Sequence, residues 1–188
     1  MKLVLASASP RRAELLQQIG VEFDICAVDI DETPWINEKP EDYVKRVALE
    51  KARAAHALPV NKNLLTLGAD TSVIVGGQIL GKPSNEEDAI GMLQKLSGVT
   101  HSVLTAVALI GKDEACIINE SRVTFRVLSE QEMHRYWATG EPTGKAGSYA
   151  IQGKAAQFIS HLEGSFSGVM GLPLYETALL LTKQGFNV

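Results

Sequence analysis

The sequence lacks a cysteine framework, a long apolar segment and a run of like charges. Its two cysteines, Cys26 and Cys116, are too few and too far apart for a disulfide framework or a cysteine-rich zinc site. We interpret them as buried thiols in a reducing compartment. No segment approaches the roughly 18 apolar residues of a membrane span, and the short apolar run at residues 1–5 does not resemble a signal peptide. These absences predict a cytoplasmic protein that does not associate with membranes.

The chain also lacks an excess of basic residues. Its 18 Lys and Arg stand against 22 Asp and Glu, which gives a net charge of −4. Binding to nucleic acid or to an anionic membrane needs many cationic side chains on one face, so we expect no nucleic-acid partner and any basic site must be local. No repeat or linker divides the sequence, and its length suits a single domain over residues 1–188.

The order of the predicted elements is typical of a mixed α/β fold. Apolar and alternating runs predict strands at 2–6, 23–28 and 64–75 and an antiparallel pair at 101–110 and 115–128. Capping and periodicity predict helices at 10–19, 40–56, 84–96, 129–139 and 173–184. The segment 140–171 is dense in glycine and is expected to form short strands and loops near a ligand.

The stretch "LASASPRR" at residues 5–12 joins the first strand to the first helix. Ser9 is expected to cap this helix, with Pro10 at its first position. A helix N-terminus binds anions, and Ser7, Arg11 and Arg12 add the hydroxyl and guanidinium groups that hold phosphate. The simpler interpretation is a capped helix with solvated arginines, but cations in a first turn oppose the helix dipole.

Asp70 interrupts the apolar strand "LLTLGADTSVIV". We place it at the end of this strand, where open α/β sheets bind ligands. A carboxylate there can hold a divalent cation, accept a proton from water, or do both. The alternative, an aspartate that begins a turn with Thr71, fits the position equally well.

Three further polar residues are candidates for the same site. The stretch "GGQILGKP" has the spacing of a P-loop, but Pro83 stands where that loop needs Ser or Thr, so Lys82 is retained only as a single phosphate contact. Glu32 and Lys51 supply an acid for metal and a base for phosphate, although each alone is more typical of a solvated surface. The four histidines show no metal-ligand spacing, and "GSFSG" lacks the serine of a nucleophile elbow.

Read together, "SASPRR", "EKARAA", "GADT", "GKP" and "KAGSYAIQG" resemble, in this order, the Maf family of nucleoside triphosphate pyrophosphatases. The resemblance runs from Leu3 to the final helix. It implies an elongated mixed sheet flanked by helices, with a cleft between two lobes, similar to inosine triphosphate pyrophosphatases. It also implies a homodimer.

The resemblance further implies hydrolysis between the α and β phosphates with a divalent metal, Mg²⁺ or Mn²⁺. The proton acceptor of the family falls on Asp70, and its specificity positions fall on Arg12, Thr71 and Gln152. One branch of the family acts on dTTP and UTP and another on 7-methyl-GTP. The "KAGSYAIQG" segment, with Tyr149 and Gln152, is similar to the pyrimidine branch. An amide such as that of Gln152 can pair with the O and N–H edge of a pyrimidine.

These observations combine into one hypothesis, in which Ser7, Arg11 or Arg12, Lys51 and Lys82 hold the triphosphate. Asp70, with Glu32 as a second acid, then positions metal and water. An ordinary aspartate, with a pKa near ~3.9, is a weak base, so either burial raises its pKa or the metal acidifies the water; we favour the metal. The alternative from another class is a regulator of cell division that binds nucleotide without hydrolysis. Such a binder gains nothing from an acid beside polyphosphate.

Overall fold

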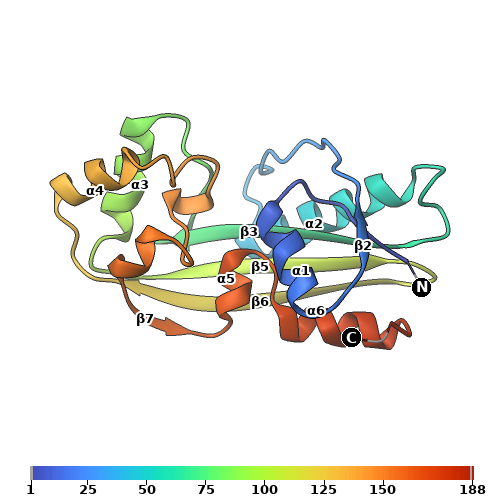
Figure 1. Cartoon of the computed structure of the whole chain (residues 1–188). Helices are drawn as coiled ribbons and strands as arrows, with labels where there is room; N and C mark the ends of the chain where they lie inside the picture. The colour runs from blue at the N-terminus through green and yellow to red at the C-terminus, as the bar shows by residue number, and fades with distance from the viewer. Residues whose placement is uncertain (1, 187) are drawn as a thin grey trace.

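A seven-stranded mixed sheet runs the length of the molecule in the computed structural model, which describes residues 2–186 and 188 (Figure 1). Its strands are β1 (Leu3–Leu5), β2 (Phe23–Ile25), β3 (Leu65–Val75), β4 (Gln78–Leu80), β5 (Thr100–Ile110), β6 (Glu114–Phe125) and β7 (Ile159–Glu163). The helices are α1 (Pro10–Gln18), α2 (Pro40–His56), α3 (Glu86–Leu96), α4 (Glu130–Trp137), α5 (Phe166–Met170) and α6 (Leu174–Lys183). Two 3₁₀ turns, η1 (Ala146–Ser148) and η2 (Lys154–Phe158), complete the fold.

The strand order is β2-β1-β3-β5-β6-β7, with β4 paired to β3 outside this path. β1 is parallel to both β2 and β3, whereas the other pairings are antiparallel. The sheet is therefore mixed and elongated, as predicted. β3, β5 and β6 are long enough to extend through two lobes (Figure 1). The first lobe also contains β1, β2, α1, α2 and α6. The second lobe also contains α3, α4, η1, η2 and β7.

Each lobe has its own apolar core. In the first lobe, α2 packs on one face of the sheet through Val44, Val47 and Ala48, while α1 and α6 cover the other face. α2 lies so close to β3 that a Cβ atom at Gly68 would overlap the carbonyl oxygen of Ala48. The close approach holds α2, and every side chain on its inner face, at a fixed height above β3.

The first helix begins as predicted at Pro10 and ends at Gln18, one residue before the predicted end. Ser9 is the N-cap and Pro10 the first helical residue, although the Ser9 side chain makes no capping hydrogen bond. At the other end Gly20 has φ of 73°, and the N–H groups of Gly20 and Val21 donate to the carbonyls of Gln17 and Leu16. This pattern is a Schellman motif, for which glycine is favoured because it adopts a left-handed backbone without strain.

Several predicted boundaries are wrong by a few residues. β2 ends at Ile25 and β6 at Phe125, so residues 26–28 and 126–128 are not strand, and Val127 is exposed. The cap of α3 is Asn85, which accepts a hydrogen bond from the N–H of Asp88, one residue later than the sequence suggested. The box at Ser129 and Glu132 is confirmed, although its helix ends at Trp137.

The expectations about the two cysteines and about membrane-spanning segments can be compared with the structure. Cys26 and Cys116 are free thiols, but they are half-buried and not fully buried as predicted. Within residues 2–186 and 188, no helix is both long and apolar enough to cross a membrane.

Candidate active site

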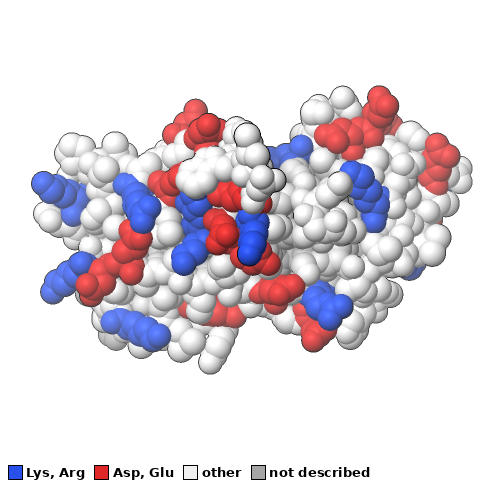
Figure 2. Space-filling model, turned by 180° about the vertical axis from the view of Figure 1, so that it is seen from behind, with Lys and Arg blue, Asp and Glu red and all other residues white. Residues whose placement is uncertain are grey.

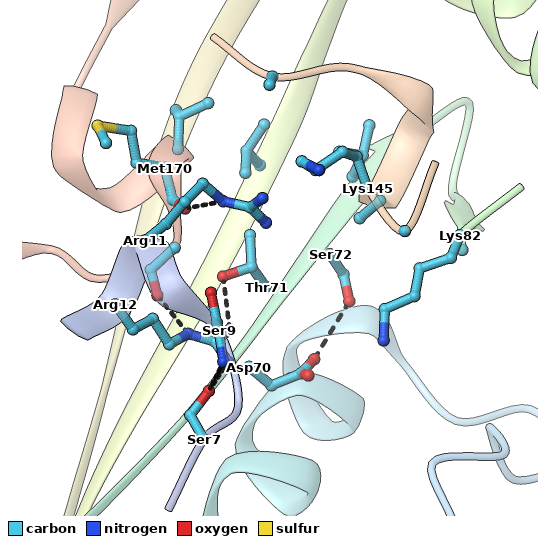
Figure 3. Close-up of a pocket in the computed structure, with 18 of the residues that line it drawn as sticks. Ser7, Ser9, Arg11, Arg12, Asp70, Thr71, Ser72, Lys82, Lys145 and Met170 are labelled. Atoms are coloured by element: carbon cyan, nitrogen blue, oxygen red, sulfur yellow. Dashed lines mark hydrogen bonds between the residues drawn. The ribbon is translucent and has the colours of Figure 1, made fainter. Parts of the chain in front are cut away.

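A cavity of about 480 Å³ lies between the two lobes and is lined by residues of both (Figure 3). Every site residue predicted from the sequence lines it: Ser7, Arg11, Arg12, Glu32, Lys51, Asp70, Thr71, Lys82 and Gln152. These residues come from segments that are far apart in the chain, and the lobes bring them together. The guanidinium pair and Asp70 therefore share one cavity, as the hypothesis requires.

Asp70 lies in the middle of β3, not at a strand end or at the start of a turn. Both sequence interpretations of its position are therefore wrong in detail. The reason it still reaches the cavity is that β1 stops at Leu5, which is paired with Leu67, while β3 continues. Asp70 lies past the carboxyl end of β1, where parallel strands leave an open crevice.

Lys51 links the two acids of the cavity. It extends from α2, is itself buried, and its Nζ lies 3.0 Å from Asp70 Oδ1 and 2.9 Å from Glu32 Oε1. Burial opposes the ionisation of Glu32, but the hydrogen bond and charge of Lys51 outweigh it and lower the pKa of Glu32. One ammonium group thus holds the two carboxylates close together.

The backbone that carries Glu32 is fixed by a tyrosine that sequence reasoning missed. Tyr43 donates its hydroxyl proton to the carbonyl oxygen of Glu32 at 2.9 Å. Burial, followed by the charges of Asp70 and Glu32, raises the pKa of Tyr43 to about 12. The hydroxyl therefore remains protonated at neutral pH and keeps donating this hydrogen bond.

Arg12 is fixed by three neutral acceptors. Its Nε donates to the carbonyl oxygen of Gly171 at 2.8 Å. Its Nη1 donates to Ser7 Oγ at 3.1 Å, and its Nη2 to Thr71 Oγ1 at 3.3 Å. Burial lowers the pKa of Arg12, an effect that the nearby Asp70 carboxylate opposes. Because a guanidinium has five N–H donors, two remain for a ligand.

Thr71 belongs to a hydrogen-bond chain with a defined direction. The hydroxyl of Thr105 donates to the carbonyl oxygen of Gly168 at 2.8 Å, so it must accept from Thr71, 2.9 Å away. Thr71 in turn accepts from Arg12. Thr105 is fully buried on β5, and nothing in the sequence marked it, because the chain forms only when β3 and β5 pair.

Two lysines complete the second-lobe side of the cavity. Figure 3 shows Lys82 and Lys145 on the side opposite Arg11 and Arg12. Lys145 was not predicted as a site residue, although it is the first residue of "KAGSYAIQG" and could have been found there. Gln152, from the same segment, also lines the cavity, as does the buried Tyr149.

The cavity is cationic even though the chain is acidic. Five cationic side chains and two carboxylates line it, a formal excess of three positive charges, against −4 for the whole chain. On the face seen in Figure 2, by contrast, basic and acidic side chains are interleaved. The basic site is therefore local, and its hydroxyl, guanidinium and ammonium donors suit an anion with several phosphates.

Comparisons with known proteins show the family of the chain. A family model described as "Maf-like protein" matches residues 2–184. The dTTP/UTP pyrophosphatase of Alkalilimnicola ehrlichii is 54% identical over 95% of this chain and 91% of its own, and that of Hahella chejuensis is 50% identical over 100% and 94%.

A solved structure of a HAM1 protein from Coxiella burnetii shares the fold. Its TM-score is 0.53, with 18% identity over 97% of this chain and 99% of that chain. The likeness supports the predicted elongated architecture, and the sequence matches carry the assignment. By its sequence over nearly the whole length, the chain belongs to the family of Maf-like proteins.

Proposed function

We propose that this protein hydrolyses dTTP and UTP to the nucleoside monophosphate and pyrophosphate. The observation that carries the proposal is the Asp70–Lys51–Glu32 cluster in a cavity with an excess of three positive charges. The names of the relatives, dTTP/UTP pyrophosphatase, supply the substrate class. Because these relatives are at least 50% identical to this protein over nearly its whole length, they support the same chemistry for it. None of the relatives cited carries a 7-methyl-GTP name.

The phosphates are held by donors from both lobes. The two free N–H bonds of Arg12 provide a planar, bidentate contact for phosphate oxygens, and its three protein acceptors keep the guanidinium from rotating. Ser7 adds a hydroxyl beside Arg12, and Lys82 adds an ammonium group from the opposite side of the cavity (Figure 3). Holding the phosphates in this way lowers the entropy cost of bringing the attacking water and the α phosphorus together.

Asp70 is proposed as the proton acceptor. Water attacks the α phosphorus, a proton passes from it to Asp70 Oδ2, and pyrophosphate leaves. Oδ1 is engaged by Lys51 at 3.0 Å, whereas Oδ2 has only a long contact of 3.5 Å from Ser72 Oγ. The less engaged oxygen is therefore the better placed to accept the proton. Lys51 keeps the carboxylate oriented.

The residues present fit a divalent cation. Mg²⁺ is usually held by one or two carboxylates together with substrate phosphates, and Asp70 and Glu32 are two carboxylates joined through one lysine. The described residues contain no group of three or more His, Cys, Asp and Glu side chains that could hold a metal ion, so Asp70 and Glu32 would hold it only together with substrate phosphates. When bound, it would neutralise phosphate charge. Lys51, which now bridges the acids, would be free to contact phosphate.

Recognition of the base is proposed for Gln152. Its side chain is exposed at the cavity, and an amide offers both a donor and an acceptor to the O and N–H edge of a pyrimidine. Tyr149 and Val73, which line the same cavity, are proposed as an apolar wall for the ring.

Product analysis tests the proposal. The protein is incubated with a panel of nucleoside triphosphates, including 7-methyl-GTP, in the presence of Mg²⁺ or Mn²⁺, and pyrophosphate and orthophosphate are measured separately. We expect pyrophosphate, with dTTP and UTP turned over fastest. Binding without any product would instead support a nucleotide-sensing regulator. Orthophosphate as the first product would contradict cleavage at the α phosphorus.

Three other properties stay predictions: the single domain over residues 1–188, the homodimer and the cytoplasmic location. Light scattering of the purified protein measures the molar mass in solution. A mass of about 20.3 kDa, that of one chain, would contradict the dimer.

A further inference from the structure

Two cations of the cavity face each other from different lobes. Arg11 lies on α1 of the first lobe, and Lys145 immediately precedes η1 of the second. Figure 3 shows the ammonium group of Lys145 pointing toward the guanidinium group of Arg11. Both side chains are half-buried, so water screens their repulsion only in part.

Each cation is anchored by neutral groups. Arg11 Nε donates to the carbonyl oxygen of Met170 at 3.3 Å, and Lys145 Nζ to that of Thr143 at 3.2 Å. In the described residues neither forms a salt bridge within 4.0 Å. The carboxylate of Glu141, near Lys145, is already engaged by the hydroxyl of Tyr136 and by backbone N–H groups.

The environment lowers the pKa of both cations. Burial and then the charge of Arg11 lower the pKa of Lys145. Burial also lowers the pKa of Arg11, an effect that Glu14 opposes. Desolvated like charges at a lobe boundary destabilise the ligand-free protein, and such a cost is typical of a binding site.

We propose that Arg11 and Lys145 form one anion subsite that bridges the two lobes and binds a phosphate group. The inference deepens the proposed function by assigning Lys145 as a phosphate ligand and by making this contact a link between the lobes. A phosphate dianion between the two side chains replaces their repulsion with two charge-assisted contacts.

Calorimetry of product analogues tests the subsite without relying on turnover. The ligands are inorganic pyrophosphate and UMP, at one fixed ionic strength. Lys145→Met should weaken the binding of at least one of them by about tenfold or more, the value of a charged contact, while Lys145→Arg retains it. Pyrophosphate or UMP as the affected ligand identifies which phosphates occupy the subsite. Lys62→Met, an exposed lysine outside the cavity, is the matched control and should change neither dissociation constant.

Thermal unfolding without ligand provides the second readout. Removing a repelled charge should leave the melting temperature of Lys145→Met equal to or above that of wild type. Because one anion contacts both groups, the losses of affinity in Arg11→Met and Lys145→Met should not add in the double variant.

The proposal is overturned if Lys145→Met changes both dissociation constants less than about twofold. It is also overturned if the ligand-free variant melts well below wild type, since Lys145 would then have a structural role. Failure of the proposed function looks different: pyrophosphate or UMP binds and depends on Lys145, yet no nucleotide of the panel is hydrolysed.

Discussion

Lys51→Met removes the ammonium group that contacts both Asp70 and Glu32 but keeps most of the apolar stem. Asp70, whose side chain is 9% exposed, would then be a buried carboxylate without its cation. Removing one partner of a buried ion pair typically costs 3 to 5 kcal/mol, and we expect about 3 kcal/mol here because Arg12 remains nearby. Glu32 is 38% exposed, so solvent screening leaves its share small.

The contribution of Glu32 to the stability lost in Lys51→Met is expected to depend on pH. Burial opposes its ionisation, but Lys51, and then Lys82 and Arg12, lower the pKa of this carboxyl. A carboxyl with a lowered pKa stabilises the folded state above its unfolded pKa of about 4.3, and this stabilisation is lost as the pH falls through the folded value. The stability difference between wild type and Lys51→Met should therefore be largest at neutral pH and should shrink below about pH 4.

Urea unfolding at pH 7.5 and at pH 4, followed by circular dichroism, measures this difference. Lys45→Met is the matched control, because Lys45 is exposed on the same helix and should change the free energy of unfolding by less than about 0.5 kcal/mol. A Lys51→Met protein within about 1 kcal/mol of wild type at pH 7.5 would refute the reasoning. So would a loss that is larger at pH 4 than at pH 7.5.

Three other substitutions test the site and its support. Asp70→Asn should lower kcat by roughly 10² to 10⁴ in the pyrophosphate-release assay, and full turnover would make Asp70 a structural residue. Thr105→Val removes the hydroxyl that donates to the carbonyl of Gly168 and accepts from Thr71, so it should lower the free energy of unfolding in urea by about 1 to 3 kcal/mol, whereas Thr105→Ser keeps both bonds; a Thr105→Val protein as stable as wild type would contradict this role. Gly68→Ala forces Cβ against the carbonyl of Ala48 and should cost about 2 kcal/mol or more, and an unchanged melting temperature would contradict the close packing of α2.

Local signals predicted the helix ends because their causes are local. Ser9, Pro10 and Gly20 define α1 through hydrogen bonds and backbone angles within a few residues. The box at Ser129 and Glu132 defines the start of α4 in the same way. The strand ends were less accurate, since β2 ends where its three-residue partner β1 ends, and this depends on a pairing partner elsewhere in the chain.

The sequence by itself determined which groups the cavity could use: hydroxyls, guanidiniums, two acids and lysines, placed in motifs that identify the family. Only the tertiary structure decided how they act together. Lys51 meets Asp70 and Glu32 because α2 packs closely on β3 at Gly68. Arg11 and Lys145 likewise face each other only because the two lobes are arranged around a shared sheet. Such contacts join residues that are far apart in sequence, so they arise from packing and not from local propensity.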